Sequence, residues 1–176
     1  MFADATAAYE ALPPELRAQV DHLDGIHVSL SAGRGRFDVL DGRAPRPLEP
    51  HEQPQRQPLV REHPVTGKRA LYMCEYGQMD WLDGPIAGMQ PGPHGDGARL
   101  LEALITHTTQ PRFVYVHEWS RGDLVVWDNR CLIHAATWFD ADQLQRVMWR
   151  TTVSGNPGAI YQGDNKSWLP ESTPAE

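Results

Sequence analysis

The chain has 176 residues, of which 40% are hydrophobic and 22% charged, as expected for one globular domain. Its formal net charge is −7, and no dense cluster of Lys and Arg is present, which argues against nucleic acid as a partner. No apolar run approaches the ~20 residues of a membrane span, and the start does not resemble a signal peptide, so we expect a cytoplasmic protein with no membrane partner.

The first quarter of the sequence predicts two helices. Residues 3–12 combine good helix formers and are stopped by Pro13 and Pro14. A second helix is predicted from Pro14 to Leu23, ended by Gly25. Residues 29–61 lose this periodicity and are predicted to form a long irregular loop.

The remaining sequence predicts one helix among several strands. The helix spans residues 97–110, with Asp96 at its positive end. The strands are expected at residues 70–73, 113–118, 124–127 and 147–153, with a turn at residues 121–123. Residues 164–176 are expected to be a disordered tail. This order predicts an α+β or mainly β fold in a single domain over residues 1–176.

Two cysteines, Cys74 and Cys131, lie beside bulky apolar residues. No CxxC pair occurs, so we expect two buried thiols rather than a structural zinc site. Tyr76, Trp81 and Trp119 are candidates to line a pocket, although aromatic residues at strand ends are more often part of the core.

The most informative segment is residues 122–136, GDLVVWDNRCLIHAA, followed by residues 146–152, RVMWRTT. The pattern predicts an apolar strand, then a polar turn followed by His134, and then a second strand that contains Arg146 and Arg150. Residues four apart lie on one side of a strand, so both arginines are expected to face the same way. An anionic ligand and ion pairs within the protein are both open as explanations of the arginines. An isolated histidine such as His134 is more often structural than metal-binding.

This arrangement resembles the closing strands of the taurine dioxygenase and 2,4-dichlorophenoxyacetate dioxygenase (TauD/TfdA) family. There, a GD, a WDNR, a histidine four residues after that arginine, and an arginine-bearing strand follow one another. Upstream, residues 63–71, HPVTGKRAL, match the HPxTG(R/K)xxL segment of the family, and residues 2–12 match the helix that follows its metal-binding strands. The resemblance therefore covers nearly the whole chain.

The resemblance implies a partial double-stranded β-helix, the jelly roll of clavaminate-synthase-like proteins, with covering helices. It implies a site for Fe(II) held by two histidines and one carboxylate, with 2-oxoglutarate as cosubstrate. By position, His134 matches the distal iron ligand and Arg150 the arginine that pairs with the far carboxylate of 2-oxoglutarate. Arg146 matches a second arginine of the same strand. Residues 127–130 are expected to form a structural turn that positions His134 rather than to bind the metal themselves.

The HxD motif that supplies the other two ligands in the family is expected ahead of Met1, so the domain is expected to be N-terminally incomplete. Two HxD strings do occur, at residues 22–24 and 94–96. The first lies at the end of a predicted helix and leads to His27, which matches a family histidine outside the iron site. In the second, Asp96 is explained by the helix it precedes. Neither string is expected to bind metal.

The resemblance thus implies a dioxygenase that hydroxylates a small anionic substrate and releases succinate and CO2. The alternative is a non-catalytic remnant that serves as a binding or assembly module. A cupin-like sugar-binding barrel would also fit the strands, but residues 127–150 argue against it. Missing strands would leave unpaired sheet edges, so a homo-oligomer or a complementing chain is a possible partner.

Overall fold

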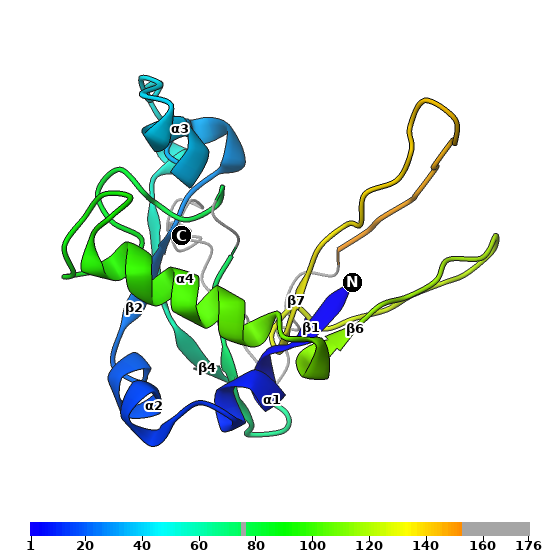
Figure 1. The fold of residues 1–176 in the computed structure, drawn as a ribbon, viewed down its shortest axis with the longest axis horizontal. Coiled ribbons are helices and arrows are strands. Elements are labelled where there is room, and N and C mark those ends of the chain that lie inside the picture. Colours follow the sequence, from blue (N-terminus) through cyan, green and yellow to red (C-terminus); the bar gives the residue numbers. More distant parts are fainter. Residues whose placement is uncertain (75–76, 153–176) are drawn as a thin grey trace, which may run out of the picture.

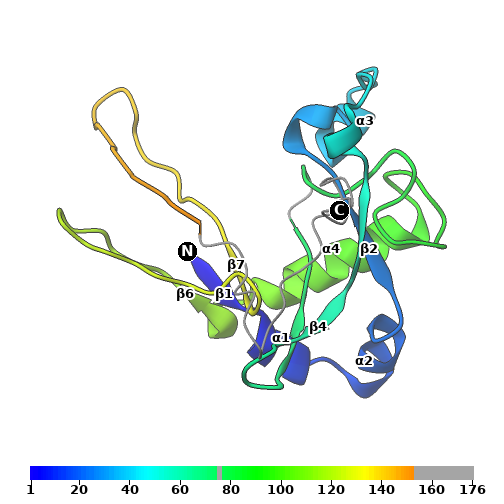
Figure 2. The same ribbon diagram turned by 180° about the vertical axis from the view of Figure 1, so that it is seen from behind.

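A computed structural model describes residues 1–74 and 77–152. The described chain forms a body, residues 1–74, 77–115 and 128–134, from which two extended arms project side by side (Figures 1 and 2). We define arm 1 as residues 116–127 and arm 2 as residues 135–152. The expected tail at residues 164–176 lies outside the described residues.

The body contains short antiparallel sheets and helices. The α-helices are α1 (Ala5–Glu10), α2 (Pro14–Val20), α3 (Arg36–Leu40) and α4 (Asp96–Thr108), and the 3-10 helices are η1 (Leu30–Ala32), η2 (Pro50–Glu52) and η3 (Pro111–Phe113). The strands are β1 (Phe2–Asp4), β2 (Asp24–His27), β3 (Gln55–Pro58), β4 (Val60–Glu62), β5 (Arg69–Leu71), β6 (Val114–Tyr115) and β7 (Leu132–His134). They pair in the orders β6-β1-β7, β2-β3 and β4-β5.

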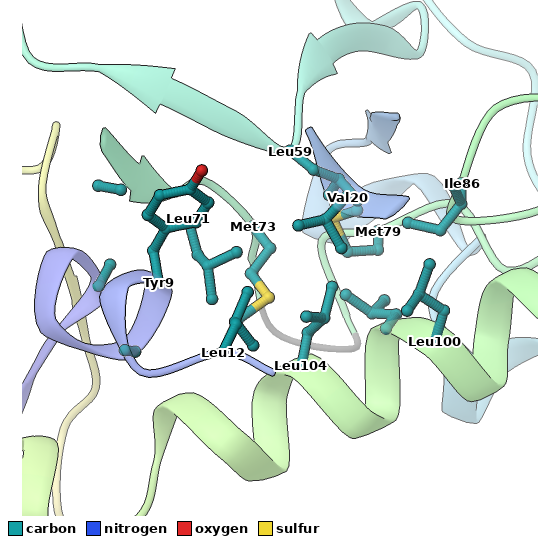
Figure 3. Close-up of a cluster of buried hydrophobic side chains, with 14 of the residues drawn as sticks. Tyr9, Leu12, Val20, Leu59, Leu71, Met73, Met79, Ile86, Leu100 and Leu104 are labelled. Carbon is teal, nitrogen blue, oxygen red and sulfur yellow. The ribbon is translucent and has the colours of Figure 1, made fainter. Parts of the chain in front are cut away.

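The core lies between α4, α1 and the β2 to β5 strands (Figure 3). Helix α4 buries Leu100, Leu101 and Leu104 on one face, as its three- and four-residue spacing predicts. The predicted helix at residues 97–110 is therefore confirmed to within two residues at each end. Trp81 is fully buried in this core, so it is not a pocket residue. Tyr76 lies outside the described residues.

The prediction of a helix over residues 3–12 is corrected at its start. Residues 2–4 form β1, the central strand of its sheet, which pairs with β6 and with β7. The side chain of Asp4 then accepts hydrogen bonds from the amides of Thr6 and Ala7, both at 2.9 Å, and α1 begins at Ala5. Helix propensity could not reveal β1, because the partners of this strand lie more than 100 residues away.

The prediction of a long loop at residues 29–61 is also corrected, since α3, β3 and part of β4 lie within it. The sequence also does not predict strand β2, which precedes this segment, because Gly25 indicates only the end of a helix. A β-carbon at Gly25 would lie 3.0 Å from the Met79 Cε and 3.2 Å from a Leu59 methyl group. This glycine therefore allows β2 to pack closely on the core.

The strands predicted at residues 124–127 and 147–153 do not form in the described residues, which end at residue 152. Leu124 and Val126 in arm 1 are 88% and 86% exposed, and Trp149 in arm 2 is 95% exposed. A strand requires a hydrogen-bonded neighbour, and the described chain supplies none to these segments. The turn predicted at residues 121–123 is present, with Gly122 at φ +95° and the Asp123 amide bonded to the Ser120 carbonyl.

The sheets contain two or three strands each, and the described residues do not close a barrel. Within this part of the chain, no helix has the length and apolar character needed to cross a membrane.

Candidate active site

His134 lies at the end of β7, at the base of the two arms. In the antiparallel pairing it stands directly opposite Phe2 of β1, and Phe2 in turn stands opposite Tyr115 of β6. Residues opposite one another project to the same face of a sheet. His134, Phe2 and Tyr115 therefore form a row across one face, whereas Ile133, Ala3 and Val114 form the row on the other face, where Ala3 is buried.

Aromatic contacts hold the His134 ring. Its centroid lies 5.0 Å from the ring of Trp127 and 6.4 Å from that of Phe2, and these two rings are 5.3 Å apart. Trp127 is itself oriented by a hydrogen bond from its Nε1 to the Asn129 Oδ1 at 2.8 Å. The rings of Trp127 and Phe2 limit the orientations open to the imidazole.

The electrostatic surroundings favour the neutral imidazole. Partial burial against the aromatic rings, followed by the positive charges of Arg150 and the N-terminus, lowers the pKa of His134. A neutral ring with an available nitrogen lone pair is the form that binds metal ions.

The two arginines predicted at the site lie on arm 2. Arg146 donates to the Thr137 carbonyl at 3.5 Å, and its guanidinium lies 5.6 Å from the centre of the Phe139 ring. Arg150 is close enough to His134 for its charge to act on that ring. The expectation that both arginines project from one side of a strand is not met here, because residues 146–152 form no strand.

The turn before His134 is built by Asp128. Its Oδ1 accepts from the Arg130 amide at 2.9 Å, and Arg130 Nε donates to both carboxylate oxygens at 2.8 and 3.0 Å. The hydrogen bonds from Arg130, and next that from His63, hold the pKa of Asp128 well below its usual range. Residues 127–130 thus form a turn held by internal hydrogen bonds.

A shallow cavity of about 280 Å³ opens beside this turn. It is lined by Asp4, Thr6, His63, Thr66, Lys68, Cys131 and Leu132. His63 and Thr66 belong to the HPVTG segment, and Cys131 follows the WDNR segment. The sequence analysis identified both motifs, but it could not show that they contact each other, as they do through His63 and Asp128.

Two residues of the cavity wall, His63 and Cys131, and the neighbouring Asp128 place one potential ligand atom each within 4.8 Å of one another. This is the one such group of three or more metal-binding side chains among the described residues. It does not include His134, so the described chain does not place two further metal-binding side chains around that histidine.

The two HxD strings are explained without metal. Asp24 forms an ion pair with Arg56 at 2.5 Å, and His22 is exposed. Asp96 lies in the first turn of α4 and pairs with Arg99. His27 lies instead on β2, where its Nδ1 is 3.3 Å from the Cys74 Sγ. Cys74 and Cys131 are only partly buried, less so than we expected.

Comparison with known proteins finds relatives that match most of this chain. A (S)-phenoxypropionate/alpha-ketoglutarate-dioxygenase of Sphingobium herbicidovorans is 37% identical over 90% of this chain and 53% of its own length. An alpha-ketoglutarate-dependent 2,4-dichlorophenoxyacetate dioxygenase of Cupriavidus pinatubonensis is 34% identical over 86% of this chain and 49% of its own. The chain thus spans about half the length of the curated relatives that it matches.

Solved structures give the same result. AAD-2 in complex with Mn(II) and N-oxalylglycine superposes with a TM-score of 0.64 at 34% identity, over 81% of this chain and 52% of that one. A putative alpha-ketoglutarate dependent 2,4-D dioxygenase from Burkholderia xenovorans gives 0.56 at 36% identity, over 74% and 46%.

These similar proteins define a class, the alpha-ketoglutarate-dependent dioxygenases. The sequence profile of one family within that class matches residues 1–152. The chain belongs to the taurine catabolism dioxygenase TauD, TfdA family.

Proposed function

We propose that this chain carries part of the active site of an Fe(II)- and 2-oxoglutarate-dependent dioxygenase that acts in the cytoplasm. The overall reaction would insert one oxygen atom of O2 into a C–H bond of a small acid. The other oxygen atom enters succinate, which forms from 2-oxoglutarate with loss of CO2. His134 is the proposed iron ligand, and Arg150 with Arg146 is proposed to bind carboxylates.

The placement of His134 is the observation that supports this proposal best. A neutral imidazole is held by two aromatic rings on a sheet face, with the charge of Arg150 close by. Arginine binds carboxylates through two parallel hydrogen bonds, which suits both 2-oxoglutarate and an acidic substrate. Because relatives are named for phenoxypropionate and 2,4-dichlorophenoxyacetate, we extend the substrate class to small carboxylic acids.

The described residues fit only part of an iron site. His134 supplies one ligand, and the remaining histidine and carboxylate must come from outside the described residues or from another chain. Fe(II) is among the weaker-binding divalent metals, so a single imidazole does not retain it. We therefore propose that the arms pack against a complementing segment or chain, which would also cover Leu124, Val126 and Trp149.

An anaerobic Fe(II) titration of the 176-residue chain, with and without 2-oxoglutarate, tests this proposal. One-to-one binding that His134→Ala abolishes would support an iron site at His134, and His22→Ala is the matched control, because His22 is exposed and distant in sequence. Binding no stronger than that of free histidine in every variant would leave the chain as a fragment without a metal site of its own.

The assignment of the arginines needs a second titration. With metal present, Arg150→Gln and Arg146→Gln should each weaken 2-oxoglutarate or substrate binding, and the more strongly affected ligand identifies the partner of each arginine. Arg121→Gln, at the tip of arm 1, is the control. Unchanged binding of both ligands in both variants would overturn the carboxylate role.

The alternative is a non-catalytic binding module, which the exposed apolar side chains of the arms favour. It predicts a defined oligomer or complex that forms without iron and survives His134→Ala. Sedimentation velocity of the chain with and without Fe(II) separates this alternative from a site that requires metal.

A further inference from the structure

The HPVTG segment forms a tight turn around a nearly buried histidine. His63 is 8% exposed, and the amides of Val65 and Thr66 both donate to its Nδ1, at 3.3 and 3.2 Å. The turn closes through the Gly67 amide, which donates to the His63 carbonyl at 2.8 Å, with Gly67 at φ +68°. We call residues 63–67 the His63 turn.

These two donors determine which ring nitrogen carries the proton. An Nδ1 that accepts hydrogen bonds from two amides has no room for a hydrogen of its own, so the neutral ring is protonated at Nε2. Nε2 lies 3.0 Å from the Asp128 Oδ2. His63 therefore donates a hydrogen bond across 65 residues of sequence to the turn that precedes His134.

Asp128 passes this restraint toward β7. Its Oδ1 fixes the Arg130 amide, and its backbone carbonyl accepts from the Cys131 amide at 3.3 Å. The Cys131 carbonyl then accepts from the Ala5 amide at 3.0 Å, which joins the turn to the start of α1. Strand β7 begins at the next residue and ends at His134, where the Ala135 amide donates to the Met1 carbonyl at 3.1 Å.

A second metal site is the competing interpretation, because His63, Asp128 and Cys131 gather three ligand atoms. The charges oppose it. The Arg130 guanidinium already occupies both oxygens of Asp128. Burial, and next the negative charge of Asp128, raises the pKa of the Cys131 thiol, which keeps the sulfur protonated at neutral pH. A metal ion would have to displace the guanidinium and the thiol proton together.

We propose that His63 is a positioning residue: its Nε2–H holds Asp128 and thereby fixes the turn that places the His134 ring opposite Phe2. The hydrogen-bonded chain from His63 to Ala135 stands on its own geometry. Its consequence for metal binding rests on the proposed function of His134. Groups that orient a metal-binding histidine commonly change metal affinity by about 10- to 100-fold when removed.

The first experiment needs no substitution. In a ¹⁵N-labelled sample of the whole chain, long-range ¹H–¹⁵N correlation spectra report which nitrogen of each neutral histidine is protonated. We expect the neutral His63 ring to carry its proton on Nε2. A proton on Nδ1 would overturn the proposal, whether or not the chain binds metal and whether or not any variant folds.

Two substitutions then test the two ring nitrogens of His63 separately: Nδ1 as an acceptor and Nε2–H as a donor. In His63→Asn, the amide oxygen can replace Nδ1 as acceptor of the turn amides, but the side chain is too short to reach Asp128. In His63→Gln, the side-chain NH2 can replace Nε2–H as donor to Asp128. His22→Asn is the control at an exposed histidine.

We expect His63→Asn to speed amide hydrogen exchange at Ala5 and Ala135 by tenfold or more and to shift the ring resonances of His134. His63→Gln should restore part of both effects, and His22→Asn should change neither. Equal disturbance in the Asn and Gln variants, or no disturbance in either, would contradict a role through Asp128. If the chain binds Fe(II), His63→Asn should also weaken that binding about 10- to 100-fold. An unchanged affinity would overturn the link to the metal site and leave the proposed function of His134 intact.

Discussion

In the body, Leu101 and Trp81 expose none of their surface, whereas in the arms Leu124 and Trp149 expose 88% and 95% of theirs. The same residue types therefore meet opposite environments within one chain. The body contains its own packing partners, since the buried leucines of α4 share one core with side chains of α1, α2 and β5. The arms do not, and they are held at their base by β1, β7 and the Asp128 turn (Figures 1 and 2).

The difference in exposure between the body and the arms distinguishes two contributions to secondary structure, burial in a core and intrinsic strand propensity. Secondary structure in the body is reinforced by burial, whereas the arms have strand-forming sequence without a neighbouring strand. The proposed ligands divide along the same line, with His134 at the anchored base and Arg146 and Arg150 on arm 2. We therefore expect substitutions in the body to affect stability and matched substitutions in the arms to affect association.

The largest difference in unfolding free energy is expected between two aspartates that each accept from a backbone amide and pair with an Arg or His side chain. Asp80 is 1% exposed and accepts from Arg34 at 3.2 and 2.7 Å, while Asp123 in arm 1 is 32% exposed and lies 3.0 Å from the His117 Nε2. Asp80→Ala should cost about 3–5 kcal/mol of unfolding free energy, because it leaves Arg34 buried with less compensation. Asp123→Ala should cost at most about 1 kcal/mol.

Urea unfolding followed by circular dichroism measures both aspartate variants. A cost for Asp123→Ala that matches the cost for Asp80→Ala would show that arm 1 is packed in solution.

Two leucines make the same comparison for apolar burial. Leu101→Ala removes a fully buried side chain from α4 and should cost about 2–5 kcal/mol. Leu124→Ala, in arm 1, should change stability by no more than about 0.5 kcal/mol. Thermal unfolding of both variants at low protein concentration provides the test, and a concentration-dependent effect of Leu124→Ala would indicate an interface formed by the arms.

The pH dependence of stability should come mainly from the body. Burial, and next the positive charge of Arg61, lowers the pKa of His27 from 6.5 to about 4. The folded state therefore disfavours the proton that the unfolded state binds below pH 6.5. The contribution of His27 is fully present above pH 6.5 and is lost as the pH falls to 4, by up to about 3 kcal/mol.

Unfolding free energies of the wild type and of His27→Gln, measured from pH 7 to pH 4, test this dependence. The variant should lack most of the decline over this range. His94→Gln removes an exposed histidine and should retain the decline. A decline of equal size in His27→Gln would assign it to other groups.

The sequence predicted the parts of the body whose order is local. Helix α4 follows from the spacing of its leucines, and the turn at residues 121–123 follows from its glycine. Strands β1 and β2 escaped prediction because each depends on a partner distant in sequence, such as Ile133 for Ala3. The strands predicted in the arms were wrong for the complementary reason, since Leu124 and Val126 have strand propensity but no partner in the described chain.

The candidate site shows the same limit. Motif spacing singled out His134, Arg146 and Arg150, and their roles stay predictions. The hydrogen bond between His63 and Asp128 had a partial signal, because both residues lie in recognisable motifs. The spacing of residues does not show that the two motifs lie in contact in the folded chain. It also does not show which nitrogen of His63 is protonated, because two backbone amides of the folded turn determine that.

The smallest effect on stability is expected at Val126, which is 86% exposed near the base of arm 1. Val126→Lys should change the free energy of unfolding by less than about 0.5 kcal/mol, because the side chain has little contact to lose. It should nevertheless reduce self-association, since a charge on an exposed strand-like segment opposes edge pairing and apolar contact. Sedimentation velocity of wild type and variant over a range of concentrations measures this, with Arg121→Lys as a charge-conserving control in the same arm. Equal association of all three proteins would mean that the apolar face of arm 1 is not the surface through which the chain finds its partner.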